Sequence, residues 1–374
     1  MSASEFQPQK KATVAAVITV AATYAYFLLF AQFGFLKALQ VATDGEPGVM
    51  KPVMGMMGLA GIAGSFLAAK IFTLARSRRM LVAGFAVSAA AAGWSLVGGP
   101  LEVFYLIALL VGLGVGLTTV TLAGMLRRVL GGGRLGITIG LGTGLAYGFC
   151  NLPLIFDAPP AIQAWWSLLI VVMGGLAVGW LELRAVEESA LVSFDYSRWG
   201  VVLWVTLFFA LVGLDSAGFY VVQHTPDLKA EMWSGEWRLG TNAAIHFIAA
   251  VAAGWALDRR WVGRILLFAA ALLVAACLMI DGVSRGFALG ATFYTAGVSV
   301  YSVALVFYPA RGMRPGFAAW VYAVAGWGGS AWGIGFAETQ HRVPLGLIGS
   351  AAGIIAVALS ARRWAGGGVE KSEV

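Results

Sequence analysis

The stretch "AGWALDRRWVGRILLFAAALL", residues 253–273, places two long apolar segments on either side of a short charged hinge. Its charges are Asp258, Arg259, Arg260 and Arg264, and apolar sequence resumes directly after them. Helices joined by so few residues must be antiparallel neighbours. The stretch therefore predicts two membrane-spanning helices joined by a basic turn.

The composition extends this prediction to the whole chain. Of the 374 residues, 60% are hydrophobic and 11% are charged, so a soluble fold would have too little polar surface. One helical crossing needs roughly 20 apolar residues, and the chain accommodates about twelve. The apolar runs are too long for the strands of an outer-membrane barrel. We therefore predict an all-α integral membrane protein.

The apolar runs and the basic residues predict the topology. The expected spans are 12–36, 49–74, 80–98, 101–125, 135–156, 160–182, 199–224, 238–257, 265–281, 285–308, 315–336 and 344–361. Alternate loops carry most of the Lys and Arg, which predicts that both termini are cytoplasmic. Topology also explains the net charge of +7, so a nucleic-acid partner is not expected.

The longest predicted cytoplasmic connection, "LELRAVEESALVSFDYSRWG", divides the chain into similar halves. We expect a six-helix bundle at 1–182, a linker at 183–198, and a second six-helix bundle with a short tail at 199–374. A shift of 185 positions places Arg79 on Arg264, each heading an apolar run. Such an internal repeat is typical of transporter folds.

The hinge resembles a signature of the major facilitator superfamily. Gly254, Asp258, Arg259, Gly263 and Arg264 are similar to the copy of that signature in the second half of such chains. The corresponding stretch of the first half, "AAKIFTLARSRRML", contains Arg78 and Arg79 but has Thr73 where the acid is expected. The resemblance implies two bundles of six helices that rock about a central site lined mainly by helices 1, 4, 7 and 10.

Asp258 is predicted to act in a conformational latch. An acid at the C-terminal end of a helix is unfavourable beside the helix dipole unless cations compensate it. Arg259, Arg260 and Arg264 are the expected cations, and with Arg78 and Arg79 they would hold cytoplasmic helix ends together. The alternative for the arginines is that they only set the topology.

Ionisable side chains within the predicted spans are candidates for function, because burying them in lipid costs at least ~2.5 kcal/mol. Asp215 lies near the middle of the seventh span, and His246 lies at a similar depth in the eighth, with Asn242 one turn away. We expect Asp215 and His246 to share a proton or a cation. The alternative is a hydrogen bond that only holds helices together.

Polar and aromatic residues elsewhere are weaker candidates for the substrate site. Tyr294, Tyr301 and Tyr308 form a stripe on the tenth span, for which packing is the alternative. The others are Tyr24, Gln32, Thr118, Thr121, Tyr147, Asn151, Trp327 and Ser330. His224 faces away from Asp215 and is expected at the membrane interface.

No Lys or Arg lies in the middle of a predicted span, which disfavours multivalent anions as solutes. The fifth span lacks the Gly-Pro signature typical of antiporters of the superfamily. Met50, Met54 and Met57 share one helix face, and thioethers select Cu(I), but methionine also fills gaps in packing.

These features together predict a secondary transporter of the bacterial inner membrane. It would carry a small neutral or cationic solute by alternating access, coupled to protons, as a monomer without a cofactor. The alternatives are a copper or other transition-metal importer and a transport-inactive sensor or assembly factor. No Walker motif or hydrolase triad supports an enzyme.

Overall fold

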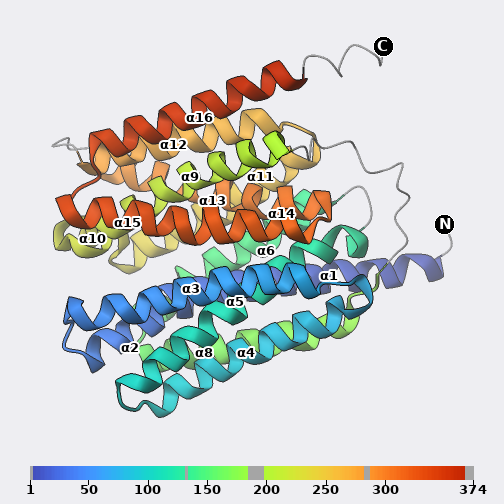
Figure 1. The fold of residues 1–374 in the computed structure, drawn as a ribbon, viewed down its shortest axis with the longest axis horizontal. Helices are drawn as coiled ribbons and strands as arrows, with labels where there is room; N and C mark the ends of the chain where they lie inside the picture. The colour runs from blue at the N-terminus through green and yellow to red at the C-terminus, as the bar shows by residue number, and fades with distance from the viewer. Residues whose placement is uncertain (1–2, 131–133, 184–197, 282–286, 367–374) are drawn as a thin grey trace.

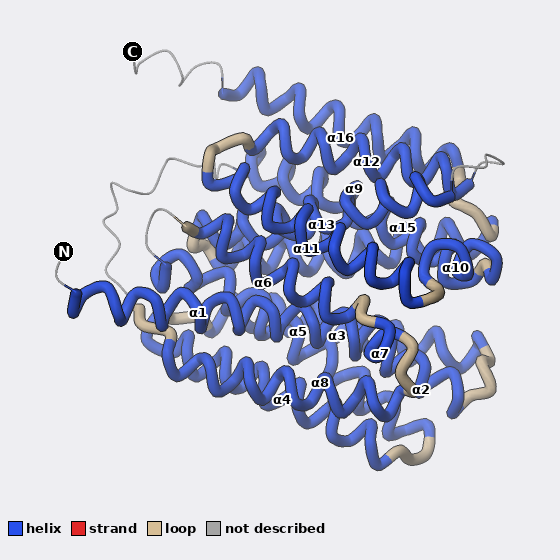
Figure 2. Tube along the Cα trace, turned by 180° about the vertical axis from the view of Figure 1, so that it is seen from behind, coloured by secondary structure: helices blue, strands red, loops and turns tan. Residues whose placement is uncertain are grey.

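The computed structural model describes residues 3–130, 134–183, 198–281 and 287–366, and within them it is built from helices without any strand (Figures 1 and 2). Helices from the first half of the chain lie together along one side, and most of those from the second half lie along the other (Figure 1). The predicted linker at 183–198 falls almost entirely outside the described residues.

The first half of the chain begins with one long helix that changes type along its length. Its elements are α1 (Ala3–Tyr26), the π-helix η1 (Phe27–Gly34), α2 (Phe35–Ala42), α3 (Pro47–Ile71), η2 (Leu74–Arg76), α4 (Ser77–Val97), α5 (Leu101–Leu130), α6 (Leu135–Cys150), α7 (Pro153–Phe156), α8 (Pro160–Ala177) and η3 (Val178–Trp180).

The second half repeats the pattern of long helices joined by short turns. Its elements are α9 (Arg198–His224), α10 (Pro226–Trp233), α11 (Glu236–Asp258), α12 (Val262–Asp281), α13 (Phe287–Gly312), α14 (Pro315–Trp320), the π-helix η5 (Val321–Gly328), α15 (Gly329–Gln340) and α16 (Leu345–Gly366).

Nine helices among the described residues are long and apolar enough to cross a membrane, so the chain is a multi-pass membrane protein. The helices α6 and α16 are shorter apolar helices. Each predicted span overlaps a helix of the structure, and the count of twelve crossings stays a prediction.

Several of the predicted spans differ in detail from the observed helices, and the first of them, at 12–36, continues to Ala42. The span at 135–156 ends as a helix at Cys150, because Pro153 lacks an N–H and forces Leu152 into an extended conformation. The span at 315–336 extends to Gln340 and is divided among α14, η5 and α15.

The helices α6 and α11 pack along a seam of glycines. On α6, Gly136, Gly140, Gly144 and Gly148 recur every four residues and face the backbone of α11. A Cβ atom added to Gly136 would overlap the carbonyl oxygen of Gly254, and one added to Gly140 would lie 2.5 Å from that of Ala250. For Gly144 and Gly148 the distances to α11 carbonyl oxygens rise to 3.1 and 3.7 Å. The two helices are thus closest beside the charged hinge and diverge away from it.

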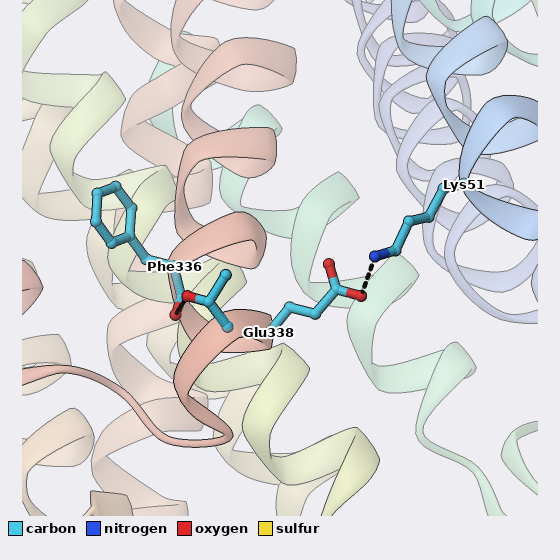
Figure 3. Close-up of polar contacts among 4 residues, drawn as sticks. Lys51, Phe336 and Glu338 are labelled. Carbon is cyan, nitrogen blue, oxygen red and sulfur yellow. Dashed lines mark hydrogen bonds and ion pairs between the residues drawn. The ribbon is translucent and has the colours of Figure 1, made fainter. Parts of the chain in front are cut away.

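On the other side of the molecule, α3 packs against the second half of the chain. The Trp327 indole lies on Gly61, where an added Cβ would overlap the ring, and Phe66 meets Trp320 edge to face. At the end of α3 remote from the hinge, Lys51 Nζ lies 2.8 Å from Glu338 Oε1 on α15 (Figure 3). The Lys51 side chain is exposed and that of Glu338 is partly exposed, so solvent screens this ion pair and it contributes little to stability.

Candidate functional site

A cavity of about 240 Å³ lies between the two halves of the chain. Its walls come from α1, η1, α2, α3, α5, α6, α9, α11, α13, η5 and α15, with Phe156 of α7 and Trp233 of α10 at one end. Both π-helices contribute to it, and π-helical segments frequently occur at functional sites. Gln32 of η1 and Trp327 of η5 are among the side chains that line the cavity.

Asp215 supplies the carboxylate of this cavity. It lies on α9 and is held by two tyrosines from α13. The Tyr294 hydroxyl donates to Asp215 Oδ1 at 2.5 Å and also contacts the Asp215 carbonyl oxygen at 3.2 Å, and the Tyr301 hydroxyl donates to Oδ2. The spacing of seven residues places both hydroxyls on one face of α13. Each carboxylate oxygen thus has one tyrosine donor.

His246 of α11 belongs to a second group of hydrogen-bonded side chains in the wall of the cavity. Its Nδ1 is 2.7 Å from the Ser299 hydroxyl, which donates in turn to the Thr295 carbonyl oxygen. The imidazole stacks on the Tyr147 ring at 4.6 Å, and the Tyr147 hydroxyl is 2.9 Å from that of Ser302. Tyr147 therefore links α6 of the first half to α11 and α13 of the second.

The structure does not pair Asp215 with His246 as the sequence suggested. Helix α13 supplies hydrogen-bond partners to both, Tyr294 and Tyr301 to Asp215 and Ser299 to His246. The predicted pairing requires the consecutive spans α9 and α11 to be packing neighbours. In the structure α13 packs against α11, and the tyrosines of α13 reach α9. Any exchange between the two groups has to run through the cavity or the hydroxyls of α13.

Four aromatic rings pack together at one end of the cavity. Phe33 lies 5.2 Å from Phe156 and 5.6 Å from Phe219, and Trp233 lies 5.3 Å from Phe219, measured between ring centroids. Phe33 and Phe156 belong to the first half of the chain and the other two to the second. We call these four residues the aromatic cluster. It lies at the end of the cavity remote from the charged hinge.

The other predicted site residues divide into two groups. Tyr24, Gln32 and Asn151 line the cavity, and so do Tyr147, Trp327 and Ser330. Thr118 and Thr121 are buried outside it, and Tyr308 stacks on Trp204 at 4.1 Å instead of lining it. The stripe of three tyrosines therefore contributes only its first two members to the cavity.

Asn242 and His224, which lie toward the helix ends remote from the charged hinge, hydrogen-bond to nearby backbone. Asn242 does not line the cavity, and its side-chain amide donates to the Met232 carbonyl oxygen at 2.8 Å, which fixes α10 against α11. His224 is exposed, as expected of an interfacial residue, and its Nδ1 contacts the Tyr220 carbonyl oxygen at 2.8 Å.

Asp258 contacts the opposite half of the chain. Its Oδ1 and Oδ2 accept hydrogen bonds from the backbone N–H groups of Gly136 and Ile137 at 2.7 and 2.9 Å. These belong to the first turn of α6, where unpaired N–H groups and the positive end of the helix dipole favour an anion. The start of α6 thus offsets the negative charge of Asp258, a role that the sequence predicts for the neighbouring arginines.

The arginines beside Asp258 contact aromatic rings. The Arg259 guanidinium lies 3.8 Å from the Trp255 ring centroid, and that of Arg264 lies 5.9 Å from the Trp261 centroid. Arg260 is exposed and adopts a positive φ at the turn. Such contacts fit anchoring at a membrane surface.

The glycines and arginines of the signature differ in their surroundings. Gly254 lies in the α6–α11 seam, whereas a Cβ added to Gly263 would have no neighbouring atom within 4 Å among the residues that the structure describes. In the first half, Arg78 donates to the Gly179 carbonyl oxygen at 2.6 Å, and Arg79 is exposed. Among the described residues, Asp258 of the second copy thus hydrogen-bonds to the opposite half of the chain, whereas the hydrogen bond of Arg78 stays within the first half.

The methionines proposed as Cu(I) ligands do not all face the cavity. Met57 lines it, whereas Met50 packs against the core and Met54 lies outside the lining. Within the described residues, no group of three or more His, Cys, Asp and Glu side chains could hold a metal ion. Cys150 and Cys277 are buried and form no disulfide, and their thiols donate to the carbonyl oxygens of Ala25 and Leu214 at 3.8 and 3.6 Å.

Several residues of the site were not singled out from the sequence. Thr23, Phe27, Ser216, Thr295, Ser302 and Tyr322 line the cavity, and Ser216 contacts Ser330 at 2.8 Å between hydroxyls. Ser216 could have been found by its place beside Asp215. The four-residue spacing of glycines on α6 was also a readable signal of close helix packing.

Comparison with known proteins defines the class of fold. No protein-family model matches the sequence, and no curated protein matches it. Among solved structures, the human organic anion transporter MFSD10 (TETRAN) matches with 15% identity and a TM-score of 0.65, over 94% of this chain and 99% of that one. The transporter FucP in its outward conformation matches with 15% identity and a TM-score of 0.65, over 94% and 98% of the two chains.

A variant of the E. coli fucose:proton symporter FucP matches in the same way, with 16% identity, a TM-score of 0.64, and coverage of 95% and 98%. These likenesses span nearly the whole of each chain. The chain therefore has the fold of the major facilitator superfamily, which confirms the resemblance seen in the sequence.

Proposed function

We propose that this protein is a secondary active transporter that moves a small solute by alternating access and couples its movement to protons through Asp215. The observation that carries the proposal is a cavity between the two halves with a carboxylate held by two tyrosine hydroxyls. A carboxyl group in a membrane interior is costly unless it has a function. FucP, which has the same fold, is a fucose:proton symporter by its description.

The proposed layout is twelve crossings in two six-helix bundles, at 1–182 and 199–374, joined by the linker at 183–198. Both termini would be cytoplasmic and the protein a monomer in a bacterial inner membrane, as the distribution of basic residues suggests. The contacts of α6 with α11, of α3 with α14 and η5, and of α13 with α5 and α6 would then join the two bundles.

Alternating access needs contacts that close one side while the other is open. The α6–α11 seam and the Asp258 cap lie at the proposed cytoplasmic end, and the seam loosens toward the opposite end. The cavity lies on the looser side, beneath the aromatic cluster. This supports an outward-directed state in which the cytoplasmic side is closed and the aromatic cluster covers the cavity.

The cavity supports a neutral or cationic solute over an anionic one. Among the described residues that line it there is no Lys or Arg, and Asp215 contributes a carboxyl group. MFSD10, an organic anion transporter by its description, shares the fold, but this cavity offers an anion no positive side chain. We therefore keep a neutral or cationic solute as the proposal.

Two alternatives have weaker support. A copper importer would need the methionines to converge, yet only Met57 of the three lines the cavity. A transport-inactive sensor or assembly factor would not need a seam that loosens along its length or a carboxylate between the halves. No catalytic residues are proposed, since the polar residues of the cavity bond mainly to one another and to the backbone.

Solute-dependent proton movement tests the proposal. Purified protein would be screened by thermal shift against sugars, amines, amino acids and metals, since a ligand of the folded state raises the unfolding midpoint. The protein would then be placed in liposomes that contain a pH-sensitive dye. We expect a binding solute to drive proton movement when it is applied as a gradient. Binding without any solute flux would instead support the sensor.

A further inference from the structure

We propose that the solute is a small alkylated ammonium ion, bound with its charge at Asp215 and its alkyl groups against aromatic rings. This inference rests on the proposed transport function and narrows its substrate class. It follows from the charge balance of the cavity, the free positions on the carboxylate, and the rings that surround it.

Asp215 determines the charge balance of the cavity. Within the described part of the chain, Asp215 is the cavity-lining residue with a formal charge, and no Lys or Arg lines the cavity beside it. The side chains that donate hydrogen bonds to its carboxylate are the Tyr294 and Tyr301 hydroxyls, which are neutral donors. An ionised carboxylate in such a place needs a counter-charge, because an unpaired charge in a poorly solvated interior is strongly unfavourable. A monovalent cation would supply that charge directly.

The carboxylate also retains room for a ligand. An ionised carboxylate offers about four lone-pair positions, and the tyrosines occupy one on each oxygen. The two hydroxyls fix the orientation of the carboxylate against α13 while the remaining positions stay available. Tyr294 and Tyr301 therefore act as positioning residues for an acceptor that is already in place before the solute arrives.

Aromatic rings supply the rest of the binding surface. The cavity is lined by Tyr24, Phe27, Phe33, Tyr147, Phe156, Phe219, Trp233, Tyr294, Tyr301, Tyr322 and Trp327, which come from both halves of the chain. Aromatic faces attract cations, and quaternary ammonium groups are the ligands best matched to several rings at once. An alkylated ammonium also loses less hydration on binding than a primary amine, which would need several hydrogen-bond acceptors.

Other solute classes fit the cavity less well. Inorganic cations such as Ca²⁺ and Mg²⁺ take about six oxygen ligands or more, and no group of three or more metal-binding side chains occurs among the described residues. A neutral sugar would leave Asp215 to be neutralised by a proton alone and would make no use of its negative charge. The volume of about 240 Å³ is below the 300–1,000 Å³ of typical drug-sized pockets, which favours a small ion.

The same carboxylate would then bind either a proton or the cation. The titratable groups that line the cavity around it are Tyr24, Tyr147, Cys150, His246, Tyr294, Tyr301 and Tyr322. None of these is an acid that could take over the role of Asp215 near neutral pH. Because one carboxylate neutralises one positive charge, binding of the cation and of the proton exclude each other. The coupling would therefore be an exchange, although the Gly-Pro antiporter signature is missing.

The test compares charged probes with a neutral isostere. Purified wild-type protein in detergent would be titrated with tetramethylammonium, choline and 3,3-dimethyl-1-butanol, in which a carbon replaces the choline nitrogen. We expect at least one ammonium probe to raise the unfolding midpoint, and the neutral alcohol to bind at least about tenfold more weakly than choline. Asp215→Asn should abolish the response, whereas Asp227→Asn, an exposed acid on α10, should retain it.

Three results would overturn the inference: no response to either ammonium probe, equal binding of the neutral alcohol, or a response that survives Asp215→Asn. The comparison of choline with its isostere uses only the wild-type protein, so it holds even if the variant folds poorly. If a neutral solute still drives proton movement in liposomes, the transport function stands and only the ammonium assignment fails. If no solute moves protons, the transport function fails as well.

Discussion

Asp215→Asn protein should fail to accumulate solute against a gradient; it should also lose exchange across equal concentrations if the solute is an ammonium ion held by Asp215, and keep exchange if the solute is neutral. Asparagine has nearly the shape of aspartate but remains neutral at every pH. The proton that would drive accumulation could no longer load on the side chain and leave within one cycle. The measurement is uptake of labelled solute into proteoliposomes, with and without a proton gradient.

The hydrogen bonds around Asp215 explain why this substitution should leave the cavity intact. The asparagine oxygen can still accept from Tyr294, and its amide can donate to the Tyr301 hydroxyl where the aspartate accepts from it. Both tyrosines thus keep a partner. A purely structural role of Asp215 therefore predicts little change in either assay, unless the reversed bond destabilises the protein and lowers its yield.

Accumulation that persists in the Asp215→Asn protein would show that another group couples transport to protons. Loss of both exchange and accumulation, at normal yield, would place Asp215 in solute binding, as the ammonium assignment requires for a cationic solute. Exchange of a neutral solute that persists without accumulation would show that Asp215 couples transport to protons but is not needed to bind that solute. The exposed acid Asp227 on α10 provides the control, since Asp227→Asn removes one negative charge without touching the cavity.

Gly254→Ala should destabilise the protein and abolish transport, although alanine is the better helix former. The added Cβ would overlap the carbonyl oxygen of Gly136, which belongs to a backbone that cannot simply turn aside. Overpacking of this kind costs roughly 1–3 kcal/mol, which exceeds the gain of about 0.5–1 kcal/mol from replacing a helical glycine. The α6 and α11 ends would be forced apart, and Asp258 would lose its hydrogen bonds to α6.

Gly240→Ala on the same helix provides the matched control. No atom lies near an added Cβ at Gly240, so this variant keeps the gain in helix propensity without the clash. Thermal unfolding and transport would be measured for both variants. If Gly254→Ala matched Gly240→Ala in midpoint and in transport, the close approach of α6 and α11 would have no part in closing the cytoplasmic side.

Much of the fold could be predicted from the sequence, because a helix in lipid has to be apolar over its whole length. The helices α3, α5 and α9 begin within a few residues of the expected positions. The end of α6 was placed too late, since the apolar run "LPLIF" continues past the proline that stops the helix. The π-helices η1 and η5 have no clear sequence signal.

The site was predictable where a residue is costly in lipid, and much less so where it depends on a partner. Asp215 and His246 were found because ionisable groups are rare in spans, and both line the cavity. Their partners on α13 depend on which helices are neighbours, which periodicity does not show. The contact of Asp258 with α6 joins residues more than a hundred positions apart, so local sequence suggested the adjacent arginines instead.

A pair of distance measurements tests alternating access most directly. Cys150 and Cys277 would first be replaced. Spin labels at Arg134 and Arg259 would then report the distance between the ends of α6 and α11 beside the hinge. A second pair, at Glu46 and Gln340, would report the distance between the ends of α3 and α15 beside the Lys51–Glu338 ion pair. We predict that each pair shows two distances, one short and one long. A change in pH or solute that lengthens the distance in one pair should shorten the distance in the other. A single distance for each pair that responds to neither, or distances that lengthen together, would contradict the account.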